Sequence, residues 1–321
     1  MSMQSVVTTA AHEARTVLTV HAPAKLNLSL AVLARRADGF HEIESLMVPV
    51  TLGDTLHVRA TEGPDIRLRV RFGGHLGQPA AATLRRDVPT DDSNLVVRAA
   101  RLLAAQAGVA SGLDIELVKE IPSGAGLGGG SSDAAATLMA AARVWGIRWP
   151  RERLAALGAE IGSDVPWFFA GGPAIAAGRG ETIRPVRGIP PLPAVIACPA
   201  AGLSTAAVYA KCSPNAERRG DAERLAAALA AGRLRAASDG MHNALAAPAK
   251  ELSSDVRRLL DDMARAGAVR PMLTGSGSAC FALARTATEA RGIAGRLSAA
   301  GWPGVFAVRI LPGGDDDGRV E

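Results

Sequence analysis

The sequence predicts an α+β protein that is built from two domains. Its 321 residues are more than one hydrophobic core usually organises and are enough for two. Segments in which apolar residues alternate with period two, as in strands, are mixed with helical segments that end at glycine. Proline and glycine cluster at 188–193, which is the best candidate for a linker between the two halves.

The first half contains a strand with one polar face. Residues 25–30 read KLNLSL, so the polar side chains, including Lys25 and Asn27, point to one side of a half-buried strand. Further strands are predicted at 43–52, 55–59, 66–72 and 113–121. Helices are predicted from Ser93-Asn94 to Gly108, over 133–145, and from Pro150 to Gly162.

The second half alternates helices with short apolar strands. Strands are predicted at 194–198, 279–283 and 305–310. Helices are predicted near 205–211, 222–231, 241–251, 254–267 and 289–300. The predicted domains are residues 16–176 and 177–311, with 1–15 and 312–321 as loose termini.

Composition disfavours several classes of protein. The net charge is +5, but the arginines are scattered in pairs without the long basic run of a nucleic-acid-binding tail. A basic protein also attracts anionic metabolites. The three cysteines lack the spacing of a disulfide framework or a zinc site, which favours the cytoplasm. No signal peptide or membrane-spanning stretch is expected.

A glycine-rich segment between a predicted strand and a predicted helix indicates a phosphate site. Residues 122–133 read PSGAGLGGGSSD. Glycines let backbone N–H groups approach an anion, and the N-terminus of the following helix adds its positive end. Ser131 and Ser132 add hydroxyl groups that suit phosphate oxygens or Mg²⁺. A flexible linker is the alternative, but linkers seldom join a clear strand to a clear helix.

This loop matches neither of two common nucleotide motifs. Gly124, Gly126 and Gly129 form a literal G-x-G-x-x-G, but a dinucleotide fold then needs a second parallel strand, and a second helix follows here. A P-loop needs Gly-Lys-Ser/Thr, and the loop has no lysine. The segment therefore predicts a phosphate site of a third kind.

Three separated segments resemble the galactokinase–homoserine kinase–mevalonate kinase–phosphomevalonate kinase (GHMP) superfamily. They are APAKLNLSL at 22–30, PSGAGLGGGSSDAA at 122–135 and LTGSGSACF at 273–281. RRADGFHEIES at 35–45, SNLVVRAARLL at 93–103 and GSDVPWFFAGGPAIAAGRGE at 162–181 resemble the branch that acts on a cytidylyl-linked methylerythritol. The resemblance runs from about residue 22 to about residue 308.

The resemblance implies a fold and a reaction. The N-terminal domain would be ribosomal-protein-S5-like and the C-terminal domain ferredoxin-like, with a cleft between them. ATP with Mg²⁺ would be the co-substrate, with no prosthetic group, and the acceptor would be the 2-hydroxyl of the cytidylyl compound, on the non-mevalonate route to isoprenoid precursors. The implied protein is a cytoplasmic monomer or homodimer with no nucleic-acid or membrane partner.

The resemblance also assigns site residues. Lys25 and Asp164 fall on the catalytic lysine and aspartate, and Ser131 or Ser132 is the candidate metal ligand. Phe40 stands where the family usually has tyrosine, so stacking is retained but a hydroxyl contact is lost. The expected ATP-binding residues are Pro122, Ser123, Gly124, Ala125, Gly126, Leu127, Gly128, Gly129, Gly130, Ser131, Ser132, Asn94 and Lys119. The expected substrate-binding residues are Asn27, Phe40, His41, Thr205, Gly275, Ser276 and Gly277.

Several alternatives stay open at this point. Lys25 could be a solvated strand lysine, Asp164 a helix N-cap before Pro166, and 274–278 an ordinary tight turn. The segment 241–251 is predicted to place His242 and Asn243 in a helix, without a role. Other functions include a GHMP kinase for homoserine or a mevalonate derivative, a nicotinamide-dependent oxidoreductase, and a basic RNA-binding module.

Overall fold

A computed structural model describes residues 17–313 of the chain, and within them the strands form two sheets. The first sheet has eight strands, in the order β4-β5-β3-β2-β9, with β1 and β6 also paired to β3 and β7 paired to β6. The second has four antiparallel strands, in the order β10-β11-β8-β12. Among the described residues, no helix is long and apolar enough to cross a membrane.

The strands of the first sheet come mainly from the first half of the chain. They are β1 (Leu18–Asn27), β2 (Ser29–Arg35), β3 (His41–Thr61), β4 (Ile66–Phe72), β5 (Gly112–Lys119), β6 (Ala174–Gly178), β7 (Thr182–Pro185) and β9 (His242–Asn243). The helices that accompany them are α2 (Leu95–Ala107), α3 (Gly129–Val144) and α4 (Arg151–Ala159), with short turns η1 (Gly74–Gly77), η2 (Pro79–Leu84) and η3 (Pro166–Ala170).

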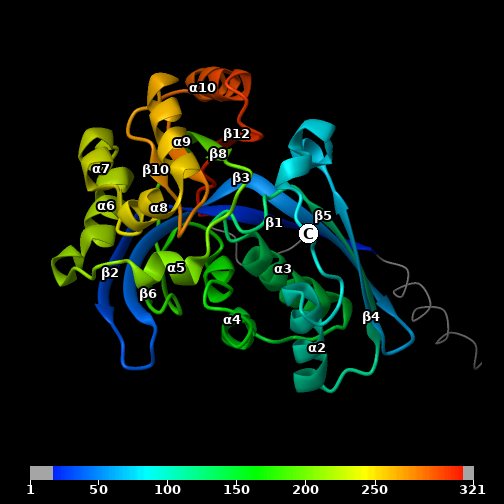
Figure 1. Cartoon of the computed structure of the whole chain (residues 1–321). Helices are drawn as coiled ribbons and strands as arrows, with labels where there is room; N and C mark the ends of the chain where they lie inside the picture. The colour runs from blue at the N-terminus through cyan, green and yellow to red at the C-terminus, as the bar shows by residue number, and fades with distance from the viewer. Residues whose placement is uncertain (1–16, 314–321) are drawn as a thin grey trace, which may run out of the picture.

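The second sheet and its helices come from the second half. Its strands are β8 (Pro193–Cys198), β10 (Met272–Leu273), β11 (Cys280–Leu283) and β12 (Gly304–Arg309). The helices are α5 (Thr205–Ala210), α6 (Asp221–Ala230), α7 (Leu234–Gly240), α8 (Ala246–Leu252), α9 (Ser254–Arg265) and α10 (Ala287–Ala299), with a turn η4 (Ala216–Arg218). In Figure 1, α6–α10 gather at the upper left, whereas α2, α3 and α4 lie together in the lower part of the view.

The two sheets share one hydrophobic core. Ile196 and Phe281 of the second sheet are buried in the same cluster as Leu26 of β1 and Val48 of β3. The alternate residues of the second sheet, such as Val195, pack in a separate cluster with α9 and α10. Burial of apolar surface on both faces therefore holds the second sheet between the first sheet and its own helices.

Many helix and strand predictions are confirmed. Helix α2 begins after Asn94, whose side chain accepts a hydrogen bond from the Val96 N–H, and ends at Gly108 in the left-handed conformation, as capping chemistry predicts. Strand β4 has the predicted bounds. The predicted strands and helices of the second half outside 241–251 are also present, within about two residues at each end.

Two strands predicted at 43–52 and 55–59 are wrong, because one continuous strand, β3, covers both. Gly53 lies where a turn would be read, but it serves close packing instead. A Cβ atom at Gly53 would lie 2.4 Å from the His21 ring and 2.9 Å from the Ala22 carbonyl oxygen. Glycine therefore lets β1 and β3 approach while the ladder continues through Pro23↔Gly53 and Ala22↔Asp54.

The helix predicted over 241–251 is also wrong at its start. His242 and Asn243 form the short strand β9, which pairs in parallel with Ser29 and Leu30 of β2. A long-range backbone pairing overrides the local helical preference here. The predicted domain boundary after residue 176 falls inside β6, and the division into domains stays a prediction.

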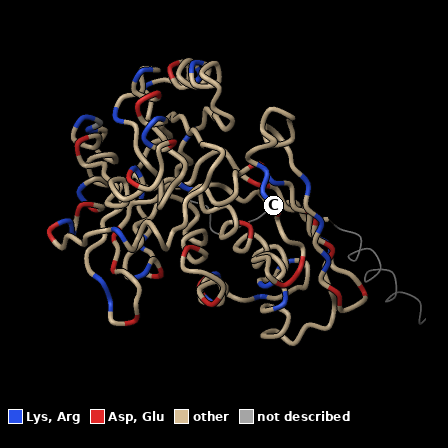
Figure 2. The backbone as a smooth tube through the Cα atoms, in the orientation of Figure 1, with Lys and Arg blue, Asp and Glu red and all other residues tan. Residues whose placement is uncertain are grey.

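Charged residues of both signs are interspersed over the outside of the molecule (Figure 2). On the exposed face of the first sheet, Arg59 contacts Asp114 at 2.7 Å and Arg71 contacts Glu116 at 2.5 Å. Such exposed pairs stabilise a fold little. They do show that the charges of Arg59 and Arg71 are each matched by a carboxylate.

A buried ion cluster joins three elements beneath the glycine-rich loop. The ammonium group of Lys119, on β5, contacts a carboxylate oxygen of Asp54 on β3 and lies 2.7 Å from Asp133 Oδ2 on α3. The other oxygen of Asp54 accepts the backbone N–H groups of Glu120 and Ile121, at 2.6 and 2.8 Å. The cluster therefore fixes the end of β5, where the loop begins.

Burial makes this cluster sensitive to pH. Desolvation, helped by the charge of Asp54 and opposed by Lys119, raises the pKa of Asp133 to about 8. An aspartate in the unfolded chain has a pKa of about 3.9. Between these values the folded state keeps a proton that the unfolded state releases, so this carboxyl makes the protein less stable as pH rises.

We expect Asp133→Asn to remove that dependence, because an amide does not titrate. Urea unfolding at several pH values from 5 to 8 should give a free energy of unfolding that falls less steeply for the variant. The difference in slope is at most about 1.4 kcal/mol per pH unit for one proton. Asp261→Asn, at an exposed position of α9, is the control. Equal slopes for wild type and Asp133→Asn would contradict the titration.

Candidate active site

Lys25 lies where the polar face of β1 meets the glycine-rich loop. The pairing of β1 with β3 shifts register between Pro23 and Lys25, and the Lys25 backbone N–H donates to the Leu127 carbonyl at 2.9 Å. A Cβ atom at Gly128 would lie 3.0 Å from Cγ of Lys25. The loop therefore packs directly on the stem of this lysine.

The ammonium group of Lys25 is buried and faces two polar partners. Its Nζ donates to Asn27 Oδ1 at 2.7 Å and lies 3.8 Å from Asp164 Oδ2. Burial lowers the pKa of Lys25, while the charge of Asp164 opposes that shift. A solvated strand lysine is thus the wrong description, because the Lys25 side chain is only 6% exposed.

Asp164 is placed to act on a ligand rather than to cap a turn. The cap position of η3 is Val165, and no side chain makes a cap hydrogen bond there, so the N-cap alternative is wrong. The Asp164 side chain is 42% exposed, and its carboxylate faces the buried ammonium group of Lys25. A carboxylate that is both accessible and held by an ammonium group suits proton transfer.

Asn27 connects Lys25 to the third segment that resembles GHMP kinases, at the loop Thr274–Ser278 (274–278). Its Oδ1 also accepts from Thr274 Oγ1 at 3.2 Å, and its backbone N–H donates to the same hydroxyl at 3.1 Å. Its Nδ2 donates to Ser45 Oγ at 2.8 Å. These contacts use the amide inside the protein, so Asn27 orients Lys25, and its contact with substrate stays a prediction.

The two glycine loops touch each other. A Cβ atom at Gly126 would lie 2.5 Å from the Thr274 carbonyl oxygen, and one at Gly275 would lie 3.1 Å from the Gly126 carbonyl oxygen and 3.3 Å from Nζ of Lys25. The Ala279 N–H donates to the Ala125 carbonyl at 3.0 Å. Only glycine fits at both contact points, so loop 274–278 is more than an ordinary turn.

Two further residues attach to this second loop. Thr205, the first residue of α5, has its hydroxyl 2.8 Å from that of Ser276. Asn243 donates from Nδ2 to the carbonyl oxygens of Leu273 and Gly275, both at 2.9 Å, and accepts from the Leu245 N–H. Asn243 has no role in the sequence-based assignment, because a strand of two residues is too short to show an alternation of polar and apolar side chains.

A pocket of about 370 Å³ lies beside the first loop. Residues 122–131 line it together with Asn94, Lys119 and Asp133. The Asn94 side chain is engaged with the Val96 N–H and the Pro89 carbonyl, and Lys119 is engaged with its two carboxylates. Both residues line this pocket, and their contact with a nucleotide stays a prediction.

The N-terminus of α3 carries two oxygens without a partner. Within the described part of the chain, the buried Ser132 Oγ and Asp133 Oδ1 accept or donate no hydrogen bond. Helix α3 begins at Gly129, earlier than predicted, so the last glycines of the motif already belong to its first turn. Unused oxygens at a helix N-terminus fit a phosphate group with its Mg²⁺.

Two aromatic rings, those of His41 and Tyr209, lie together near Asp164. The His41 ring lies 5.1 Å from the ring of Tyr209 on α5. Burial and the charge of Asp164 raise the pKa of Tyr209, so this tyrosine is close to both predicted site residues. Phe40 is 50% exposed, with the Arg179 guanidinium 5.0 Å from its ring.

Sequence reasoning missed Tyr209. Tyr209 lies outside all of the segments that resemble GHMP kinases. One signal could have found it: it is the only tyrosine among the 321 residues. A lone tyrosine on a helix next to Thr205, an expected site residue, was a candidate for the aromatic partner of His41.

Comparisons with known proteins agree with this geometry. Residues 94–172 match the GHMP kinases N terminal domain, and residues 225–302 match the GHMP kinases C terminal model. The first match contains the glycine-rich loop and Asp164, and the second contains Asn243 and loop 274–278. The two models together cover the segments that meet at Lys25.

Several curated relatives that are 36–42% identical over about nine tenths of the chain share one name. A 4-diphosphocytidyl-2-C-methyl-D-erythritol kinase of Rhodopirellula baltica is 42% identical over 308 residues, which are 89% of this chain and 92% of that protein. One from Nocardioides sp. is 39% identical, over 90% of this chain and 95% of that protein. The crystal structure of a 4-(cytidine 5'-diphospho)-2C-methyl-D-erythritol kinase has a TM-score of 0.74 and 36% identity, and the match covers 92% of this chain and 100% of that chain. The chain therefore belongs to the 4-diphosphocytidyl-2-C-methyl-D-erythritol kinase family of GHMP kinases.

Proposed function

We propose that this protein transfers the γ-phosphoryl group of ATP to the 2-hydroxyl of 4-diphosphocytidyl-2-C-methyl-D-erythritol. The observation that carries the proposal is the Lys25–Asp164 pair, which lies where the two glycine loops meet. The first loop, which lines the nucleotide pocket, packs on Lys25, and Tyr209 of the His41–Tyr209 ring pair feels the charge of Asp164. A phosphoryl donor and a nucleotide-linked alcohol could thus meet at this carboxylate.

The residues have distinct roles in this reaction. The alcohol oxygen attacks the γ-phosphorus, the bond from that phosphorus to the bridging oxygen of ADP breaks, and Asp164 accepts the alcohol proton. Lys25 stabilises the negative charge of the transferred group and holds Asp164, and Asn27 orients Lys25. Backbone N–H groups of residues 124–131 bind the phosphate chain, together with the positive end of α3, whereas the Ser132 N–H donates to the Gly128 carbonyl.

Metal and base recognition complete the proposal. Ser131 or Ser132 would hold Mg²⁺, with Asp133 Oδ1 nearby as an unused oxygen, and the ion would neutralise phosphate charge. His41 and Tyr209, with Phe40, would hold the cytosine ring, since aromatic faces stack on bases. Thr205 and residues 275–277 would form the wall beside the acceptor. We also propose a cytoplasmic monomer or homodimer.

The acceptor should be specific for the cytidylyl compound. A release assay for ADP should show turnover with 4-diphosphocytidyl-2-C-methyl-D-erythritol and almost none with homoserine or mevalonate, because those alcohols cannot engage the His41 end. We expect a ratio of kcat/KM on the order of 10⁴. Comparable turnover with either simple alcohol would reject this acceptor, and protection from heat by NAD but not by ATP would favour the oxidoreductase alternative.

Asp164→Asn should abolish most turnover and leave nucleotide binding nearly intact, because the amide cannot accept the proton. We expect kcat to fall roughly 10²- to 10⁴-fold, with the Kd for ATP, measured by calorimetry, changed little. Lys25→Ala should lower kcat more than it raises KM. Asp261→Asn is the control for loss of a carboxylate. Near wild-type kcat in Asp164→Asn would remove the base assignment, and a Lys25→Ala effect confined to KM would reassign Lys25 to binding.

A further inference from the structure

Arg86 lies between the first glycine loop and the second half of the chain. It belongs to the segment that joins η2 to α2, two residues before Val88, which lines the nucleotide pocket. A Cβ atom at Gly124 would lie 3.2 Å from Nη1 of Arg86, and one at Gly202 would lie 2.2 Å from Nη2. Gly202 is in the segment between β8 and α5. The guanidinium group therefore rests against two backbones that frame the phosphate loop.

Arg85, the neighbouring residue, has a structural role, because its guanidinium is used within the protein. Arg85 donates from Nε to the Leu76 carbonyl at 2.6 Å and from Nη2 to the Gln78 carbonyl at 2.8 Å. Its guanidinium also lies 5.7 Å from the centre of the Phe72 ring. Arg86, by contrast, is exposed and makes no hydrogen bond or ion pair with any residue from 17 to 313.

The positive charge inside the site is otherwise already matched. Lys25 faces Asp164, and Lys119 faces both Asp54 and Asp133. The two ammonium groups are therefore already engaged by carboxyl groups, in a site that must accept polyphosphates. Like charges at short range are costly where water is partly excluded. Apart from any metal ion, Arg86 is the uncommitted cation among these described residues that contacts the loop.

We propose that Arg86 binds phosphate oxygens of a nucleotide at the first glycine loop. This inference rests on the proposed function and deepens it. A guanidinium presents several N–H donors in a fixed plane that matches phosphate geometry, and it stays charged at any physiological pH. The two sources of that chemistry are the triphosphate of ATP and the diphosphate of the cytidylyl substrate. Glycine at 124 and 202 leaves room for the guanidinium to lie beside the loop.

Separate binding measurements distinguish the two sources. Arg86→Gln is titrated by calorimetry with ATP and, independently, with the cytidylyl substrate, and KM is measured for each. We expect the Kd of one ligand to rise roughly ten- to a hundredfold, as for loss of a hydrogen bond to a charged group. The ligand that weakens identifies the phosphate source. Arg86→Lys should recover part of the loss, because lysine restores the positive charge but not the planar set of donors. Added salt should weaken ligand binding by the wild type more than binding by Arg86→Gln.

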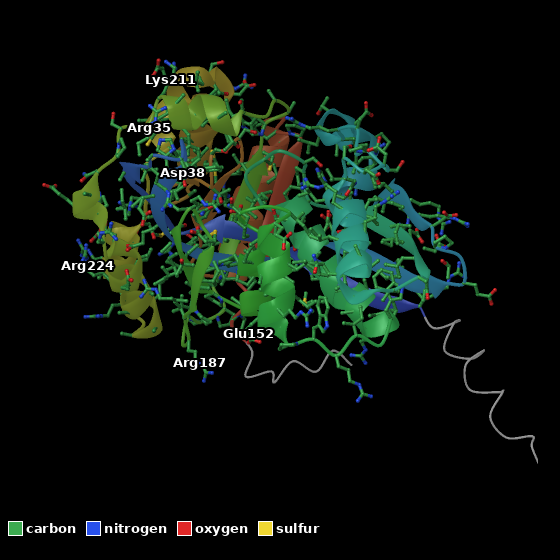
Figure 3. All side chains as sticks on the ribbon, turned by 90° about the horizontal axis from the view of Figure 1, so that it is seen from below. Arg35, Asp38, Glu152, Arg187, Lys211 and Arg224 are labelled. Carbon is green, nitrogen blue, oxygen red and sulfur yellow. The ribbon has the colours of Figure 1, made fainter. Side chains whose placement is uncertain are left out.

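Matched variants keep the inference falsifiable. Gly202→Val leaves Arg86 in place but displaces its guanidinium, so it should reproduce the loss if Arg86→Gln folds poorly. The control is Arg187→Gln, at an exposed arginine that Figure 3 shows at the lower edge of the molecule, pointing outward. Unchanged Kd values for both ligands in Arg86→Gln, or an equal loss in Arg187→Gln, would overturn the inference. A wild type that binds ATP but releases no ADP with the cytidylyl compound would instead reject the proposed function.

Discussion

The ion cluster of Lys119, Asp54 and Asp133 is the constraint on which the site depends. It ties β3, β5 and α3 together in a dry environment, where a broken pair costs several kcal/mol because one charge is left uncompensated. The first glycine loop runs from the end of β5 to the start of α3, so its two ends are set by Lys119 and Asp133. A loop with so many glycines has little stiffness of its own, and its conformation must come from such anchors and from contacts with other segments.

Much of this architecture could be predicted from local chemistry. Capping by Asn94 and Gly108 follows from backbone hydrogen bonding that neighbouring residues decide. By contrast, the half-buried strand predicted at 25–30 is wrong, because both of its faces are buried and the chain there is divided between β1 and β2. The resemblance of three segments to GHMP kinases brought together Lys25, the first loop and loop 274–278, although they are distant in sequence. These segments then proved to be in contact through Gly126, Gly275 and Asn27.

The failures have a common physical origin in long-range contacts. The predicted break near Gly53 is wrong because this glycine packs against His21 on another strand. The helix predicted at 242–243 is wrong because these residues pair with β2 instead. Tyr209 lies next to His41 only after α5 has packed beside the first sheet. The roles of Asn243 and Arg86 likewise depend on contacts with residues far along the chain. A reading of neighbouring residues cannot supply such contacts.

The contact between the two glycine loops also limits how the molecule can move. Gly126 and Gly275 meet in tight contact, and the hydrogen bond from the Ala279 N–H to the Ala125 carbonyl joins the same segments. A hinge opening between the two loops would have to break that bond and expose the core that both sheets share. Evolution has little freedom at these two positions, since a side chain gained at Gly126 or Gly275 would require the opposite loop to retreat.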